Sequence, residues 1–198
     1  MENINILYID DNADPYISQY LCDEYKYENI IINYEEHTFG TDESYDTLLA
    51  ERSLHMADVI IIDSVLFEHA NMSSNKLTGE EFEVILKKVF PFKEVIVVTQ
   101  NDVDDDIMII KKYNTSSKES ATCFFEQNWK PVLDKAIDKI ILYRKILRRI
   151  EEKDYVEQYF LEGIQQSLKG ESGYDSLTVA DIDRLISMFE SVKKEYDD

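Results

Sequence analysis

The chain has 198 residues, with 41 Asp and Glu against 21 Lys and Arg, a formal charge of −20, and 44% apolar residues. This apolar fraction can supply a globular core, so the acidity does not indicate wholesale disorder. The negative charge argues against nucleic acid and anionic membranes as partners, because both are themselves negatively charged.

Three short, continuously apolar runs predict strands buried on both faces of a parallel sheet: Ile4–Ile9, Val59–Ile62 and Val95–Val98. Weaker strands are expected at Ile30–Asn33 and Thr122–Phe125. Stretches of helical character lie between the strands, at Pro15–Tyr25, Tyr45–His55, Glu80–Val89 and Val103–Tyr113. The alternation of strand and helix predicts an α/β fold, a doubly wound, flavodoxin-like sheet of five parallel strands.

The C-terminal quarter of the chain is predicted to be helical. Apolar residues recur at helical spacing from Val132, and no Gly or Pro interrupts residues 132–162. This pattern predicts either one extended helix or two helices with a bend near Glu151–Asp154. A last amphipathic helix is expected to begin near Thr178. We therefore expect an α/β domain at residues 1–150 and a helical extension at residues 151–198 for interaction or dimerisation.

A basic stretch and two cysteines stand out from the acidic background. Seven basic residues between Lys130 and Arg149 stand against two acidic ones, a local net charge of +5. They predict either a solvated helix face or a contact surface for an acidic partner or the chain's own acidic face, with nucleic acid as a less favoured ligand. Cys22 and Cys123 lack the paired spacing of zinc sites and disulfides, and we expect both to be buried.

Acidic side chains follow two of the apolar runs: Asp10 and Asp11 follow Ile4–Ile9, and Asp63 follows Val59–Ile62. Ligands of a doubly wound sheet bind beyond the carboxyl ends of its strands. Three carboxylates there repel one another, so a hard cation such as Mg²⁺ is expected to hold them. A remaining carboxylate could then be phosphorylated, with Thr99 bonding a phosphoryl oxygen and Lys130 pairing with its charge.

This order of residues, with Pro131 after Lys130, resembles the receiver domain of bacterial two-component response regulators over residues 4–150. The resemblance implies that Asp63 is the phosphoacceptor and that Asp10 and Asp11 hold Mg²⁺ together with it. It also implies self-phosphotransfer at an aspartate rather than turnover as an enzyme.

The same resemblance assigns roles to residues around the acceptor. The backbone carbonyl of Val65 would be a further metal ligand, Thr99 the switch hydroxyl, and Lys130 the lysine that contacts the phosphoryl group. Gly79 matches a glycine that commonly follows the acceptor loop.

The leading hypothesis is a cytoplasmic signalling protein that takes a phosphoryl group from a histidine kinase or phosphotransfer protein. It would transmit the change through its C-terminal helices to a downstream protein or a second copy. No segment is predicted to span a membrane and no basic leader is visible.

Two alternatives remain open. A pseudo-receiver would keep the fold as a protein-interaction module without phosphorylation, because Glu126–Trp129 sets Lys130 further from the expected strand than the family pattern does. A phosphatase of the haloacid-dehalogenase type would use Asp10 as its nucleophile. That family needs a second aspartate two residues later, where this chain has Asn12.

Overall fold

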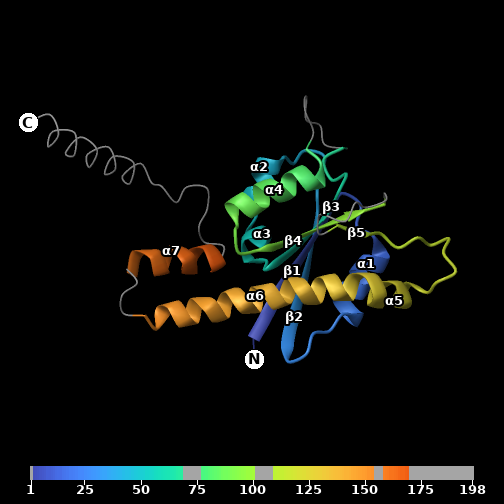
Figure 1. Cartoon of the computed structure of the whole chain (residues 1–198). Helices are drawn as coiled ribbons and strands as arrows, with labels where there is room; N and C mark the ends of the chain where they lie inside the picture. Colours follow the sequence, from blue (N-terminus) through green and yellow to red (C-terminus); the bar gives the residue numbers. More distant parts are fainter. Residues whose placement is uncertain (1, 69–76, 101–108, 154–157, 170–198) are drawn as a thin grey trace, which may run out of the picture.

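The structure is a computed structural model that describes residues 2–68, 77–100, 109–153 and 158–169 (Figure 1). Five strands form one parallel sheet in the order β2-β1-β3-β4-β5. Their bounds are β1 (Glu2–Asp10), β2 (Ile30–Thr38), β3 (Val59–Asp63), β4 (Glu94–Thr99) and β5 (Ile109–Lys111). This is the strand order of a flavodoxin-like sheet, so the predicted fold class is confirmed.

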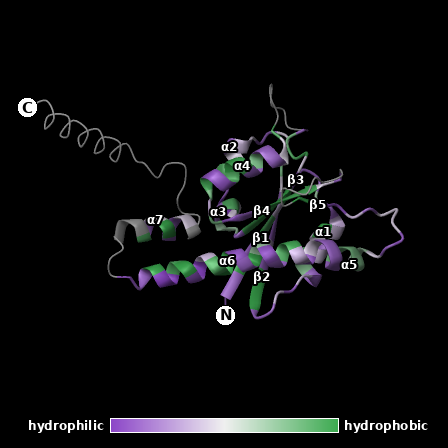
Figure 2. Ribbon diagram, in the orientation of Figure 1, coloured by the Kyte–Doolittle hydropathy of each residue, from purple (hydrophilic) through white to green (hydrophobic). Residues whose placement is uncertain are grey.

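Helices cover both faces of the sheet (Figure 1). One face carries α1 (Pro15–Gln19), its π-helical continuation η1 (Tyr20–Glu24), and α6 (Lys130–Glu151). The other face carries α2 (Tyr45–Ala50), α3 (Arg52–Met56) and α4 (Gly79–Val89). Because successive strand residues point to opposite faces, β1 sends Ile6 and Tyr8 into the first core and Leu7 into the second. Figure 2 shows the apolar strands enclosed between these helices.

The fifth strand is not where the sequence places it. Thr122–Phe125 falls in α5 (Ala121–Phe124) and a π-helical turn, η2 (Phe125–Trp129). The side chain of Ser120 caps α5 by accepting a hydrogen bond from the Cys123 N–H. Phe125 and Trp129, four residues apart, are both buried in the first core. Burial on a helical spacing therefore overrides the strand propensity of the aromatic run.

β5 instead lies inside the stretch that was predicted as a helix, Val103–Tyr113. Residues 103–108 of that stretch lie outside the described residues. A strand of three residues is too short to show a periodic signal, which explains the wrong prediction. Cys22 and Cys123 are both exposed, also against expectation, on the solvent sides of η1 and α5.

Of the two alternatives for the C-terminal region, the structure has two helices, α6 and α7 (Gln158–Lys169). Figure 1 shows α7 lying along the C-terminal half of α6, and Gln165 donates a 2.6 Å hydrogen bond to Glu151. The proposed domain boundary at residue 150 falls in the last turn of α6. The helix expected from Thr178 lies outside the described residues.

Basic residues of α6 bind the amino end of the sheet. Arg144 lies 2.7 Å from Asp58, and Lys139 lies 3.0 Å from Glu94, which is only 1% exposed. Lys87 of α4 reaches the same Glu94 carboxylate at 3.3 Å, and Arg148 lies 3.2 Å from Glu2. Three of the seven basic residues of the predicted stretch therefore contact acidic residues of the chain outside α6 and fix α6 against the sheet.

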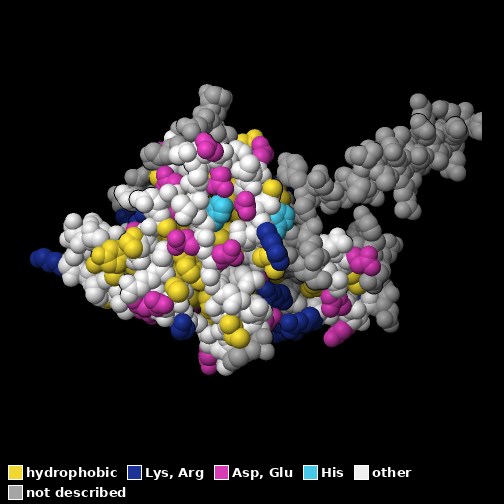
Figure 3. Space-filling model, turned by 180° about the vertical axis from the view of Figure 1, so that it is seen from behind, with side chains coloured by type: hydrophobic (Ala, Val, Ile, Leu, Met, Phe, Trp, Pro, Cys, Tyr) yellow, Lys and Arg dark blue, Asp and Glu magenta, His cyan; other side chains and the backbone are white. Residues whose placement is uncertain are grey.

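The remaining surface is strongly acidic. Figure 3 shows Asp and Glu side chains spread over the face opposite to the view of Figure 1, with fewer basic ones among them. In the described part of the chain, every helix is too short or too polar to cross a membrane.

Buried tyrosines characterise the first core. Tyr8, Tyr20 and Tyr25 are each no more than 1% exposed. Burial raises the pKa of all three above its ordinary value, and neighbouring carboxylates raise it further. Lys93 shows the opposite effect, since burial lowers the pKa of its ammonium to about 8.

These shifts predict a maximum in stability near pH 10. Between pH 8 and about 10.4 the unfolded chain retains a proton on Lys93 that the folded chain loses, so the free energy of unfolding rises by up to about 1.4 kcal/mol per pH unit. Above about pH 10 the three tyrosines ionise in the unfolded chain but stay protonated in the folded one. Each of these tyrosines then lowers the free energy of unfolding by about 1.4 kcal/mol per pH unit. Guanidinium unfolding at pH 7 to 11 measures the profile. A free energy of unfolding that is constant above pH 10 would contradict it.

Candidate functional site

The carboxyl edge of the sheet gathers the predicted acidic residues. Asp10 and Asp63 are the last residues of β1 and β3, and they are 1% and 2% exposed. Asp11 follows Asp10, and each of these three residues places a carboxylate oxygen within 4.8 Å of the others. Thr99, the last residue of β4, is also buried. The structure thus brings together the carboxylates that the sequence selected.

Lys112, which the sequence analysis missed, supplies the positive charge of this cluster. Its ammonium lies 2.8 Å from Asp63 Oδ1 and 3.0 Å from Asp10 Oδ2. The lysine directly follows β5, and its backbone N–H donates to the carbonyl of Thr99 at 2.8 Å. This backbone bond fixes the start of the side chain beside the ends of β3 and β4.

Lys130 does not reach the cluster, which corrects the prediction made for it. It begins α6, where its ammonium donates to the Lys26 carbonyl at 3.0 Å, contacts the Tyr25 ring and lies 3.7 Å from Asp134. The error followed from the misplaced fifth strand. The signal that could have found Lys112 is the apolar run 107–110, which ends in lysines just as the first run ends in aspartates.

The electrostatics of the cluster depend on burial. Burial raises the pKa of Asp63, while the hydrogen bond and charge of Lys112 oppose that rise. The pKa of Lys112 is also raised, because its bonds to Asp63 and Asp10 outweigh the effect of burial. The ammonium is therefore firmly charged and partly offsets the repulsion between the carboxylates.

The loop after Asp63 is anchored in the second core. Leu66 and Phe67 are buried, and the Phe67 ring packs edge-to-face on Phe39 and Phe82. The N–H of Val65 donates to Asp63 Oδ2 at 3.2 Å, and the Val65 carbonyl accepts from Glu68 at 2.9 Å. A carbonyl has a second lone pair, so this bond leaves one for the metal contact expected of Val65.

The donor set fits Mg²⁺. Carboxylate and carbonyl oxygens are the ligands that this hard cation prefers. Oxygens bound to one Mg²⁺ at about 2.1 Å lie at most about 4.2 Å apart, so a cluster within 4.8 Å needs only small side-chain shifts to close on the ion. Asp10, Asp11, Asp63 and the Val65 carbonyl would hold it.

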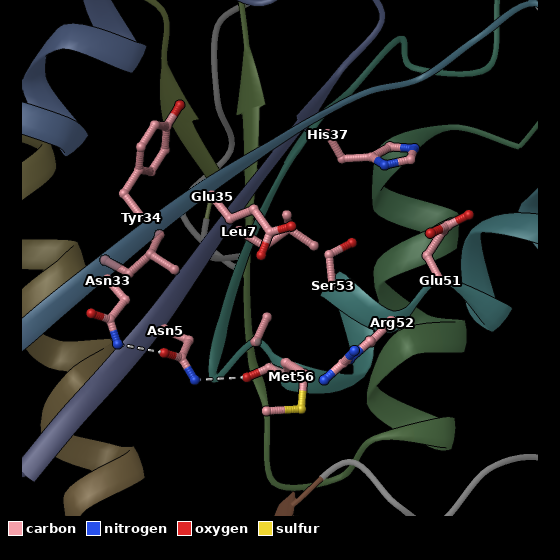
Figure 4. A pocket seen from close by; sticks show the side chains of 12 residues that line it. Asn5, Leu7, Asn33, Tyr34, Glu35, His37, Glu51, Arg52, Ser53 and Met56 are labelled. Atoms are coloured by element: carbon pink, nitrogen blue, oxygen red, sulfur yellow. Dashed lines mark hydrogen bonds between the residues drawn. The ribbon is translucent and has the colours of Figure 1, made fainter.

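Two pockets lie near the sheet, one beside Lys112 and one between β1, β2 and α3. A cavity of about 320 Å³ borders Lys112 and is lined by Gln100, Tyr113, Asn114 and Thr115. A larger pocket of about 610 Å³ lies between β1, β2 and α3 (Figure 4). There Asn33 donates to Asn5, which in turn donates to the Met56 carbonyl. The larger pocket includes none of the clustered carboxylates.

Comparison with known proteins gives distant matches. No protein-family model matches the chain, and no curated protein does. Among solved structures, the response regulator RcsB of Salmonella typhimurium has a TM-score of 0.42 and 16% identity, over 86% of this chain and 91% of that chain. An RcsB–DNA complex has a TM-score of 0.38 and 16% identity, over 87% and 93%. A structure of two RcsB dimers bound to two parallel DNAs has a TM-score of 0.38 and 19% identity, over 85% of this chain and 90% of that chain.

These structures correct one expectation. The acidic composition argued against nucleic acid as a partner, whereas the solved structures that match include RcsB bound to DNA. Net charge alone does not exclude nucleic acid as a partner, because it averages over a whole chain.

Gly79 permits the close approach of α4 to the loop that follows Asp63. Its N–H donates to the Ser64 carbonyl at 2.8 Å. A Cβ at this position would lie 2.6 Å from the Asp63 carbonyl oxygen and 2.8 Å from the Ser64 Cα. Both contacts are with backbone, which cannot rotate away.

We therefore predict that Gly79→Ala destabilises the protein by about 1–3 kcal/mol, the usual cost of overpacking. Chemical denaturation measures the change. Gly163→Ala in α7 is the matched control, because among the described residues no atom beyond its chain neighbours and its own helix backbone lies within 4 Å of the added Cβ. That variant should gain about 0.5–1 kcal/mol from helix propensity. Equal stability changes in the two variants would refute the role assigned to Gly79.

Proposed function

We propose that this chain is a receiver-like signalling protein whose Asp63 accepts a phosphoryl group from a histidine kinase or phosphotransfer protein. One observation supports the proposal above others. The buried Asp63 carboxylate lies with Asp10 and Asp11 at the carboxyl edge of the sheet, and the Lys112 ammonium is 2.8 Å away.

The reaction would be an in-line transfer. A carboxylate oxygen of Asp63 attacks phosphorus, the bond from phosphorus to the donor breaks, and the donor leaves with the electron pair. Bound Mg²⁺ would offset charge on the transferring phosphoryl group. Lys112, in the role first expected of Lys130, would pair with the same charge, and the hydroxyl of Thr99 would bond a phosphoryl oxygen.

A structural route leads from this site to the C-terminal helices. The indole N–H of the buried Trp129 donates to the Lys111 carbonyl at 3.0 Å, and Lys111 directly precedes Lys112. Trp129 in turn directly precedes α6. A movement of Lys112 toward a phosphoryl group would therefore alter the support of α6, and with it the surface offered to a downstream protein or a second copy. DNA belongs among the ligands to be tested, because RcsB binds it.

A pseudo-receiver is the second candidate, and a specific contact favours it. Lys112 already bridges Asp10 and Asp63, so the cluster is partly neutralised without a metal. The phosphatase hypothesis gains no such support. That phosphatase family needs a second aspartate two residues after the nucleophile Asp10, and Asn12 stands there.

Labelling with acetyl phosphate in Mg²⁺ tests the proposal. We expect Asp63→Asn to abolish labelling, because the nucleophile is lost. Lys112→Met should slow labelling at least tenfold, about 1.4 kcal/mol of transition-state stabilisation. Lys130→Met should label like the wild-type protein, because Lys130 contacts Lys26 and Asp134 instead.

Folding of each variant is checked by circular dichroism, and metal dependence by addition of a chelator. Labelling that persists in Asp63→Asn would refute the acceptor assignment. A loss of labelling in Lys130→Met but not in Lys112→Met would refute the assignment of Lys112. Mg²⁺ binding without labelling of the wild-type protein would favour the pseudo-receiver.

A further inference from the structure

Tyr8 connects the first core to the acidic cluster. Its side chain is fully buried in the first core, and its hydroxyl donates to Asp10 Oδ2 at 2.5 Å. The same hydroxyl accepts a 3.3 Å hydrogen bond from the N–H of Asp14, the residue that caps α1. Tyr8 thus joins the carboxylate of Asp10 to the start of the first helix.

The two oxygens of Asp10 are bonded unequally. Oδ2 accepts from both the Tyr8 hydroxyl and the Lys112 ammonium, whereas Oδ1 accepts from the N–H of Asn12 at 2.9 Å. Each carboxylate oxygen has about two lone-pair sites. In the described contacts, Oδ2 is therefore saturated and Oδ1 retains one lone pair for a further ligand.

We propose that Tyr8 is a positioning residue that restricts Asp10 to binding a cation through one oxygen, and so favours Mg²⁺ over Ca²⁺. The inference rests on the magnesium site of the proposed function. Mg²⁺ takes ligands in a strict octahedron, usually with one oxygen from each carboxylate, whereas the larger Ca²⁺ accepts both oxygens of one carboxylate. A hydroxyl that occupies Oδ2 disfavours the second mode.

Tyr25 provides a matched control within the same core. It is also buried, and its hydroxyl also donates to a carboxylate, that of Asp134 at 2.8 Å. Asp134 belongs to α6 and is not a member of the acidic cluster. Removing either hydroxyl deletes one buried hydrogen bond, but only Tyr8 acts on the proposed ligand.

Calorimetric titrations with Mg²⁺ and with Ca²⁺ test the inference on the full chain. In Tyr8→Phe we expect the dissociation constant for Mg²⁺ to rise about tenfold, as is usual when a residue that orients a metal ligand is lost. The constant for Ca²⁺ should rise less than about threefold, because the freed oxygen can join its coordination. Tyr25→Phe should leave both constants unchanged. Tyr8→Met, which also lacks the hydroxyl, is a second variant, and thermal unfolding checks that each protein is folded.

The outcomes separate this inference from the proposed function. Wild-type dissociation constants in Tyr8→Phe and Tyr8→Met, or equal changes in Tyr25→Phe, would overturn the role of Tyr8 alone. If the wild-type protein binds Mg²⁺ but is never phosphorylated, the proposed function fails, and the change in Mg²⁺ preference still decides the role of Tyr8. If it binds no Mg²⁺, both are overturned.

Discussion

The repulsion between carboxylates at one edge of the sheet is the constraint on which this structure depends. Parallel strands end together, so Asp10 and Asp63 are forced into proximity by the topology and not by a flexible loop. Buried charges are stable only when they are paired and hydrogen-bonded. Lys112, Tyr8, and the N–H groups of Asn12 and Val65 meet this requirement from four different segments.

The position of Lys112 follows from a chain of packing constraints. β5 has only three residues, and its pairing with β4 sets the height at which Lys112 leaves the sheet. The indole N–H of Trp129 also donates a hydrogen bond to the carbonyl of Lys111, the residue before Lys112. Because α6 begins at the next residue, the ionic contacts that hold α6 to the sheet also hold Trp129 in place. The carboxylate cluster and α6 are thus parts of one packed unit.

The sequence correctly predicted the strands that appear as continuous runs of apolar residues. Buried runs such as Val59–Ile62 and Val95–Val98 identify parallel strands, and from them the sheet edge and its aspartates follow. Lys112 was missed although the apolar run 107–110 ends beside it. β5 is too short to outweigh a helical interpretation, while Phe124 and Phe125 resemble a strand until the packing of Phe125 against Tyr20 and Trp129 is known. The contact of Tyr8 with Asp10 was equally hidden, because an apolar run does not show which hydroxyl reaches a neighbouring residue.

The ratio of acidic to basic residues differs between the two ends of the sheet. This difference supports placing the proposed site at the carboxyl end. At the amino end, Glu2, Asp58 and Glu94 are matched by Lys87, Lys139, Arg144 and Arg148, so three negative charges meet four positive ones. At the carboxyl end, the cluster of Asp10, Asp11, Asp63 and Lys112 has three negative charges and one positive, a formal sum of −2. At the amino end the negative charges are fully compensated, and the ion pairs hold α6 against the sheet. The carboxyl end has a formal charge that one divalent cation would neutralise, and this supports the proposal that the site lies there and not at the larger pocket.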